Sequence, residues 1–365
     1  MSIDLRSFLL IVALILAPAA LAQQTNRPSQ PADNSIHLDV VVTHKSGPPI
    51  SGLQQREFTV LDNNVPQTIT SFQAVDGDKA PIEVTVLIDA VNAPYQAIAY
   101  ARDQIDKVLL ADDGDLAHPT SLAVLTDTGL EFHHGFSQDG NKLRAALDQY
   151  TLGLRSIRRS AGFYGAAERF QLSLEGLHQL VQRDGRLPGR KIVLCVSPGW
   201  PLLSGPEVQL DSNKQKQLFA DIVDFSTDFL RDRITLYNVN PWGASESLER
   251  EDYWQSFLKG ISKPGQVTPG DLGLQVLATH SGGLVLAANN DVAGLLQKCL
   301  ADARTYYEVS FQPSTDDQPG KYHRLQVRVS KSGLTARTTQ GYYTSPNANW
   351  SSPPTPIDSG DPLHR

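Results

Sequence analysis

The sequence predicts an α/β protein with a doubly wound, mostly parallel sheet and a β-sandwich formed by strands from both ends of the chain. From residue 81 to about residue 304, apolar strand-like runs alternate with amphipathic helix-like runs. That alternation is typical of a parallel sheet with helices on both faces. Residues 36–76 and 305–343 instead contain short strand-like segments and close turns without a helix. Because small isolated sheets are marginally stable, we expect these two parts to pair with each other.

The parallel sheet is expected to centre on residues 82–89, a nearly unbroken run of apolar and β-branched residues that ends in Asp89. Such a run is typical of a strand that is buried on both faces. An amphipathic helix-like run, residues 95–110, follows directly. Ligands of open α/β sheets bind at the carboxyl ends of the strands, so Asp89 indicates where a functional site is to be sought.

The remaining elements follow from the same periodicities. In the α/β part, strands are predicted at 121–126, 130–136, 191–197, 234–239 and 284–287, and helices at 141–150, 163–183, 210–231, 245–259, 272–280 and 292–303. The flanking parts are predicted to contain strands at 36–43, 58–61, 67–72, 306–312, 322–329 and 334–339. The segment Asp127-Thr128-Gly129 separates two of these strands by so few residues that we expect a hairpin there.

The N-terminus has the pattern of a secretory signal peptide. An apolar run at residues 8–16 is followed by Ala20-Leu21-Ala22, which predicts cleavage after Ala22. The run is shorter than the roughly 20 residues that a membrane span needs. We therefore expect a signal peptide at 1–22, a flexible leader at 23–35 and a disordered tail at 344–365. The mature chain is expected to be periplasmic or secreted, without a membrane span.

Charge and cysteine content restrict the partners and the chemistry. The net charge of -7 argues against a nucleic-acid partner, because phosphate binding needs a basic surface. Cys195 lies in a strand-like run and Cys299 in a helix-like run. Export permits a disulfide, but bridging requires specific geometry and buried cysteines often act as small apolar residues. Two buried thiols are therefore favoured over a disulfide.

A central strand that ends in Asp89, a hairpin at one sheet edge and helices on both faces resemble a von Willebrand factor type A domain. That family typically has a metal-ion-dependent adhesion site, in which an Asp-x-Ser-x-Ser loop, a Thr and a second Asp supply the oxygen ligands that divalent cations prefer. In this chain Val91 and Ala93 stand at the two Ser positions. Ser197 stands where the second Asp is expected, and residues 156–162 contain no Thr. The resemblance therefore implies a degenerate site without a metal.

A closer resemblance is carried by several stretches that occur in order along the chain. They are LQQREF at 53–58, LIDAVNAP at 87–94, GRK at 189–191 with SPG at 197–199, THSGG at 279–283, YYEVSF at 306–311, GKYH at 320–323 and GYY at 341–343. Together they resemble the VWFA-related exported bacterial proteins of the acidobacterial type. This family supplies no catalytic residues that can be transferred, and it implies neither an enzyme nor a cofactor.

Cys195-Val196-Ser197-Pro198-Gly199 approaches the Gly-x-Ser-x-Gly nucleophile elbow of serine hydrolases. The elbow needs Gly at its first position for a strained turn, and Cys195 stands there. Pro198 lacks the backbone N–H that the residue after the nucleophile donates in the oxyanion hole. We therefore expect a turn at the end of a strand.

Two tryptophans follow strands that should end at the same sheet edge as Asp89. Aromatic side chains on such loops can anchor partners, although local packing explains them equally well. We predict that Asp89, Asn92, Ser197, Trp200 and Trp242 form a partner-binding edge. The predicted function is that of an exported, non-enzymatic binding or adhesion-type protein, whose partner is another protein or a surface polymer and whose binding needs no metal or cofactor.

Two other functions remain as alternatives. A metal-dependent adhesin would take its ligands from non-standard positions such as Asp89, Asn92 and Asp127. A serine hydrolase would use Ser197 as its nucleophile.

Overall fold

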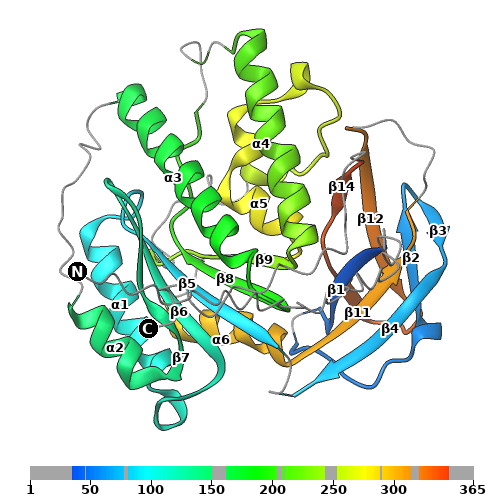
Figure 1. The fold of residues 1–365 in the computed structure, drawn as a ribbon, viewed down its shortest axis with the longest axis horizontal. Helices are drawn as coiled ribbons and strands as arrows, with labels where there is room; N and C mark the ends of the chain where they lie inside the picture. Colours follow the sequence, from blue (N-terminus) through cyan, green and yellow to red (C-terminus); the bar gives the residue numbers. More distant parts are fainter. Residues whose placement is uncertain are drawn as a thin grey trace, which may run out of the picture. The chain divides into compact units, whose positions relative to one another are not determined.

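The structure is a computed structural model, which describes residues 35–45, 47–77, 81–149, 162–203, 208, 210–242, 253–287, 290–313 and 320–344. The predicted signal peptide, nearly all of the predicted leader and all of the predicted tail except residue 344 lie outside these residues. All described residues belong to one unit, residues 33–365. They form a six-stranded sheet and two four-stranded sheets (Figure 1).

The six-stranded sheet is mostly parallel, as predicted. Its strands are β5 (Ile82–Asp89), β6 (Asp115–Thr126), β7 (Gly129–Asp139), β8 (Arg190–Val196), β9 (Ile234–Val239) and β10 (Val285–Leu286). Their order is β10-β9-β8-β5-β6-β7. Only β7 runs antiparallel to its neighbour, with which it forms the predicted hairpin. Every residue of β5 except Glu83 is buried, because helices cover the sheet on both sides.

Two apolar clusters attach the helices to the sheet. On one face lie α1 (Tyr95–Leu109), α2 (Gly140–Gln149) and α6 (Val292–Arg304). On the other face lie α3 (Gly162–Asp184), α4 (Ser212–Arg231) and α5 (Leu274–His280) (Figure 1). Successive strand residues point to opposite faces, so Val86 and Ile88 belong to the first cluster and Leu87 to the second. The predicted helices on both faces are therefore present.

The two smaller sheets are antiparallel and combine strands from both ends of the chain, as expected. One has the order β13 (Leu334–Arg337), β1 (Ile36–His44), β11 (Thr305–Phe311), β4 (Ile69–Asp76). The other has the order β14 (Gly341–Tyr343), β12 (Tyr322–Val329), β2 (Phe58–Asp62), β3 (Val65–Gln67). Val40 on β1, Val60 on β2 and Val327 on β12 belong to one shared apolar cluster.

Several predicted elements differ from the structure. The single strand predicted at 67–72 is two strands, β3 and β4, which belong to different sheets because the chain crosses over at Thr68. The helix predicted at 272–280 begins only at Leu274, because Gly273 takes an extended conformation after a 3₁₀ turn, η8 (Pro269–Leu272). Within the described part of the helix predicted at 245–259, there is only a 3₁₀ helix, η6 (Tyr253–Phe257).

Both cysteines are buried free thiols. Cys195 lies in the cluster that contains α3 and Cys299 in the cluster that contains α1, so the sheet separates them. The prediction of two unpaired thiols is confirmed. Among the described residues, no helix is both long and apolar enough to span a bilayer.

Candidate functional site

The candidate site lies where the carboxyl ends of β5 and β8 meet. These strands are parallel neighbours, but the chain leaves β5 towards β6 on one side and leaves β8 towards β9 on the other. The strand order therefore reverses between β5 and β8, and such a reversal creates the crevice in which α/β sheets bind ligands. Asp89 ends β5, and Ser197 follows β8 directly.

Asp89 is completely buried and accepts hydrogen bonds from several donors of its own chain. Its Oδ1 accepts from the backbone N–H of Val91 at 3.1 Å and of Asn92 at 2.9 Å. Its Oδ2 accepts from Ser197 Oγ at 2.6 Å and from Asn92 Nδ2 at 2.9 Å. Burial raises the pKa of Asp89 above its ordinary value, although these hydrogen bonds oppose the shift. The carboxyl group thus orders the loop after β5.

The hydrogen-bond network continues into α3 and into the loop after β8. Asn92 Nδ2 donates to Ser173 Oγ at 2.8 Å, and Ser173 Oγ donates to the backbone carbonyl of Arg169 at 2.7 Å. On the other side, the N–H of Gly199 donates to Ser197 Oγ at 3.1 Å. Ser173 had not been predicted as a site residue. Its only sequence signal is a small polar side chain on the mostly apolar buried face of a helix.

Gly199 is required by the geometry of the second loop. Its φ is +98°, a left-handed conformation that favours glycine. A Cβ at this position would also lie 2.1 Å from Nε2 of Gln275 on α5. Any other residue would therefore strain the backbone of this turn and displace the side chain of Gln275.

The described residues do not fit the oxygen cage of a metal-ion-dependent adhesion site. Val91 and Ala93 are 7% and 3% exposed and belong to the apolar clusters on opposite faces of the sheet. The oxygens of Asp89 already accept hydrogen bonds from protein donors, and hard cations need six or more oxygen ligands. No group of three His, Cys, Asp or Glu side chains in the described residues is arranged to hold a metal. The segment in which a Thr ligand was sought, 156–162, is described only at Gly162.

The structure does not present Ser197 as a nucleophile. The side chain is completely buried and donates a hydrogen bond to Asp89, whereas a catalytic serine needs an adjacent base and access to substrate. Burial raises the pKa of the nearby Cys195 thiol well above its ordinary value, so the reactive thiolate is disfavoured. Neither side chain has the surroundings of an activated nucleophile.

The two tryptophans predicted at this edge have different surroundings. Trp200 is 6% exposed, and its ring meets that of Phe170 edge to face at a centroid distance of 6.4 Å. It therefore takes part in local packing against α3. Trp242 is 38% exposed, and its backbone N–H donates to Oδ1 of Asn240 at 3.0 Å. The structure thus buries Asp89, Ser197 and Trp200 and leaves Trp242 at the surface.

Three further exposed apolar residues lie at the same edge and had not been predicted. Tyr95 begins α1 and is 57% exposed, Tyr164 lies in the first turn of α3 and is 83% exposed, and Leu202 follows β8 and is 41% exposed. We refer to Tyr95, Tyr164, Leu202 and Trp242 as the carboxyl-edge patch. The sequence indicates these residues only through their positions. Each follows the end of a strand or lies at the start of a helix, outside the buried face of that helix.

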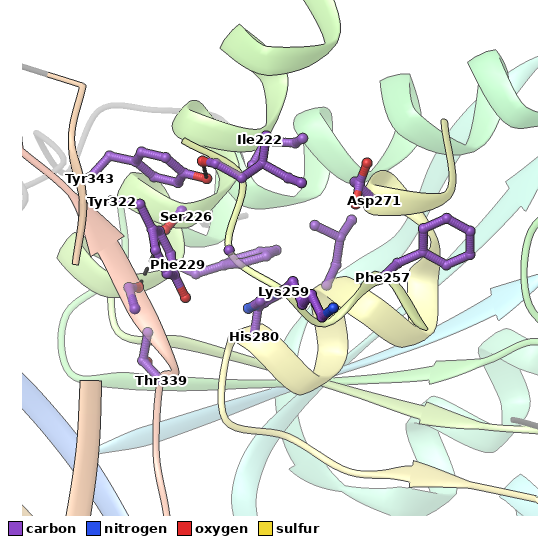
Figure 2. Close-up of a pocket in the computed structure, with 14 residues that line it drawn as sticks. Ile222, Ser226, Phe229, Phe257, Lys259, Asp271, His280, Tyr322, Thr339 and Tyr343 are labelled. Atoms are coloured by element: carbon purple, nitrogen blue, oxygen red, sulfur yellow. Dashed lines mark hydrogen bonds between the residues drawn. The ribbon is translucent and has the colours of Figure 1, made fainter. Parts of the chain in front are cut away.

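A separate hollow lies between α4, the segment at 257–261, α5 and the strands β12 and β14 (Figure 2). Its cavity volume is about 30 Å³, which leaves room for only a few water molecules. The hydroxyl of Tyr343 donates to the backbone carbonyl of Ile261 at 2.8 Å, and burial lowers the pKa of His280 to about 4. His280 is therefore neutral at pH 7. The hydrogen bond from Tyr343 holds the segment at 257–261 against β14. The cavity itself is too small for a drug-sized ligand.

No protein-family model and no curated protein matches this chain. Among solved structures, it resembles proximal thread matrix protein 1 from the mussel byssus, with 10% identity, coverage of 64% of this chain and 48% of that chain, and a TM-score of 0.33. It also resembles a mutant of the PilB minor pilin from Streptococcus sanguinis, with 11% identity, coverage of 62% and 63%, and a TM-score of 0.33. The SpRpn10 VWA domain matches with 12% identity, coverage of 64% and 98%, and a TM-score of 0.28.

The chain spans about half the length of the mussel protein and 63% of the pilin chain. At these TM-scores and identities the likeness is weak, and it carries no argument about function.

Proposed function

We propose that this chain is an exported, non-enzymatic binding protein that contacts another protein or a surface polymer through its carboxyl-edge patch, without a metal ion. The observation that carries the proposal is the exposure of four large apolar side chains at one sheet edge, with Tyr164 at 83% and Tyr95 at 57%. Single exposed apolar residues are common, whereas several at one end of a sheet are candidates for a partner contact. Tyrosine and tryptophan are also the residues that most often dominate binding energy.

The buried network beneath the patch supports this role. Asp89, Asn92 and Ser173 connect β5 to α3, and Ser197 connects the same carboxylate to β8. The loop after β5 and the turn after β8, which precede Tyr95 and Leu202, are thereby ordered before a partner arrives. Preorganisation of this kind reduces the entropy that is lost on binding. In this proposal Asp89, Asn92 and Ser197 position the loops, and Trp242 makes contact.

A more specific assignment of the fold accompanies this proposed function. We infer that the α/β part is a von Willebrand A-like domain with a degenerate adhesion site, spanning about residues 81–304. We also infer that the two antiparallel sheets form one β-sandwich. The shared apolar cluster supports this inference, because it contains Val40 from one sheet and both Val60 and Val327 from the other.

The proposal is tested by measuring whether the purified full chain is retained by two materials in separate experiments. One is immobilised envelope protein extract, and the other is insoluble cell-wall polymer. We expect the wild type to be retained by one of them in the presence of EDTA. The double variant Tyr164→Ala with Trp242→Ala should bind at least about tenfold more weakly, because truncation of an aromatic anchor typically costs 1 kcal/mol or more. Val65→Ala is the matched control, since Val65 is 58% exposed but lies on β3.

Two outcomes would contradict the proposal. If neither material retains the wild type, the carboxyl-edge patch is not a binding surface for these classes of partner. If EDTA abolishes retention and magnesium restores it, the metal-dependent adhesin is the better description.

A further inference from the structure

Strand β4 (Ile69–Asp76) is an edge strand of one of the antiparallel sheets. It stands at the end of its sheet and pairs only with β11 among the described strands. It is eight residues long and contains no Pro, Lys or Arg, and its one charged residue, Asp76, is the last of the strand. Such an edge presents a row of backbone N–H and C=O groups that can pair with another strand.

The other described edge strands have features that hinder pairing with another chain, and these features are nearly absent from β4. Strands β10, β14 and β3 have two or three residues each, and β3 also contains Pro66. Strand β13 has four residues and ends in Arg337. Strand β7 is long, but its pairing with β6 has register shifts and it contains Glu131 and Asp139. Short length, proline, charge and irregular register are the means by which proteins prevent edge-to-edge pairing. On β4 the register shift, between Ser310 and Phe311 of β11, affects only the end at Ile69.

An apolar ring lies at the rim of this edge. Phe72 of β4 is only partly buried, although its ring lies 5.2 Å from that of Phe58 and 5.8 Å from that of Tyr307. These two neighbours belong to the apolar cluster that the antiparallel sheets share. A strand added next to β4 would therefore extend the sheet and also cover an exposed part of this cluster.

We propose that β4 pairs antiparallel with β4 of a second copy of this chain, about a two-fold axis at Phe72. In this register the two Phe72 residues face each other, Ser71 lies opposite Gln73, and Thr70 lies opposite Ala74. Ile69 lies beyond the register shift and packs on the opposite face from Val75, so these two residues do not pair. The half-buried Phe72 rings then meet each other, and the exposed residues on either side of them meet exposed residues. Directly opposed residues are the unit of cross-strand stabilisation, so β4 is complementary to itself.

The charges on β4 do not oppose pairing with a second copy. Asp76 falls opposite Thr68, outside the strand, so the pairing brings no like charges face to face. A two-fold contact of this kind is closed, since the same strand serves both partners. The inference does not depend on the proposed function, because β4 lies outside the carboxyl-edge patch.

Sedimentation velocity of the purified full chain, from about 1 to 100 µM, tests the proposal, because dimerisation follows mass action. The wild type should shift from monomer to dimer over this range. Ser71→Glu with Gln73→Lys places opposite charges face to face across the axis and should keep the dimer. Ser71→Lys with Gln73→Lys places like charges there and should weaken dimerisation at least about tenfold.

The two variants form a matched pair, since both have Lys at position 73, where it faces Glu308 of its own chain. They differ only in the sign of the charge at exposed position 71, and equal circular-dichroism melting curves would show that both are folded. A monomeric wild type over the whole range, or equal dimerisation of the two variants, would overturn the proposal. Slow hydrogen exchange in a monomer of those β4 amides that do not hydrogen-bond to β11 would show that another segment covers the edge, and it would overturn the proposal too.

Discussion

At the scale of single residues, Asp89 is the best-connected side chain of the candidate site. An isolated buried carboxylate would be very unfavourable, but Asp89 accepts hydrogen bonds from two backbone N–H groups, one hydroxyl and one amide. Val91 and Ala93, which replace the expected serines, are buried in apolar clusters on either face. The loop therefore gains packing where an adhesion-type metal site would need oxygens. These residues make Asp89 a structural group in this chain.

Asp89→Ala is expected to lower the free energy of unfolding by about 2–4 kcal/mol, because it leaves several buried donors without their acceptor. Urea unfolding measures this loss. Asp127→Ala, in the turn of the β6–β7 hairpin, is the control and should change stability by less than about 0.5 kcal/mol. If magnesium stabilises the wild type but neither variant, Asp89 and Asp127 bind a metal, and the structural role assigned to Asp89 is wrong.

At the scale of elements, β5 carries a second carboxyl group at its opposite end, where α3 and β8 meet it. Oε2 of Glu83 is buried and has no hydrogen-bond partner among the described residues. Burial and then the nearby negative charge of Asp184 raise the pKa of Glu83 to about 7. Asp184, which is 1% exposed, accepts a hydrogen bond from Thr85 Oγ1 at 2.8 Å. Two acidic groups thus share the amino end of the central strand.

This arrangement predicts a pH dependence of stability. The pKa of Glu83 is about 7 in the folded chain against an ordinary value of 4.5, so the folded state binds more protons between these values. Stability should therefore fall as the pH rises from about 5 to 8. Glu83→Gln removes this titration, so the loss of stability between pH 5 and pH 8 should be smaller by on the order of 1 kcal/mol. The effect is no larger because solvent screens a partly exposed carboxyl group.

Urea unfolding at both ends of this pH range measures the effect. Glu131→Gln, at an exposed position on β7, is the control. An unchanged slope in Glu83→Gln would show that other groups cause the pH dependence.

At the scale of the whole described unit, a group of ion pairs joins the six-stranded sheet to the antiparallel sheet of β1 and β11. Arg233, just before β9, donates to Asp39 of β1 at 2.5 Å and also to Glu308 of β11. Arg190, at the start of β8, lies 3.7 Å from Asp39 and donates to the backbone carbonyl of Asp302 at 2.7 Å. The two sheets are thereby connected by charged groups that are largely buried.

Arg233→Met is expected to destabilise the chain by about 3–5 kcal/mol, because it leaves Asp39 buried with a weaker partner. Adding Asp39→Asn should cost less than the sum of the two single changes, since the residues interact directly. Burial favours a raised pKa for Asp39, but Arg233 and Arg190 outweigh it and hold the pKa below the ordinary 3.8. The contribution of the pair is thus present at neutral pH and is lost as acid protonates Asp39.

Urea unfolding of the two single variants and the double variant, at pH 7 and at about pH 3, tests both statements. Additive losses at pH 7 would show that Arg233 and Asp39 do not stabilise the chain as a pair.

The elements that could be predicted from the sequence are those whose pattern is local. The eight residues of β5 match their predicted bounds, because a strand buried on both faces is continuously apolar. Helices α1, α3 and α6 also lie within about one residue of prediction. Strand β14 was not predicted, because three residues are too few to show a period. Ser173 and Tyr164 could not be found either, because their roles depend on which strand ends lie near α3.

The sequence by itself determined the alternation of strands and helices, the central strand that ends in Asp89 and the pairing of the chain's two ends. Local periodicity and turn residues suffice for these features, because they reflect which side of each element faces the apolar core. Only the tertiary structure decided that Ser197 donates to Asp89, that β3 and β4 enter different sheets and that β4 has one partner strand among the described residues. These features depend on contacts between residues far apart in the chain, and a local pattern shows that a strand needs a partner without showing which strand it is.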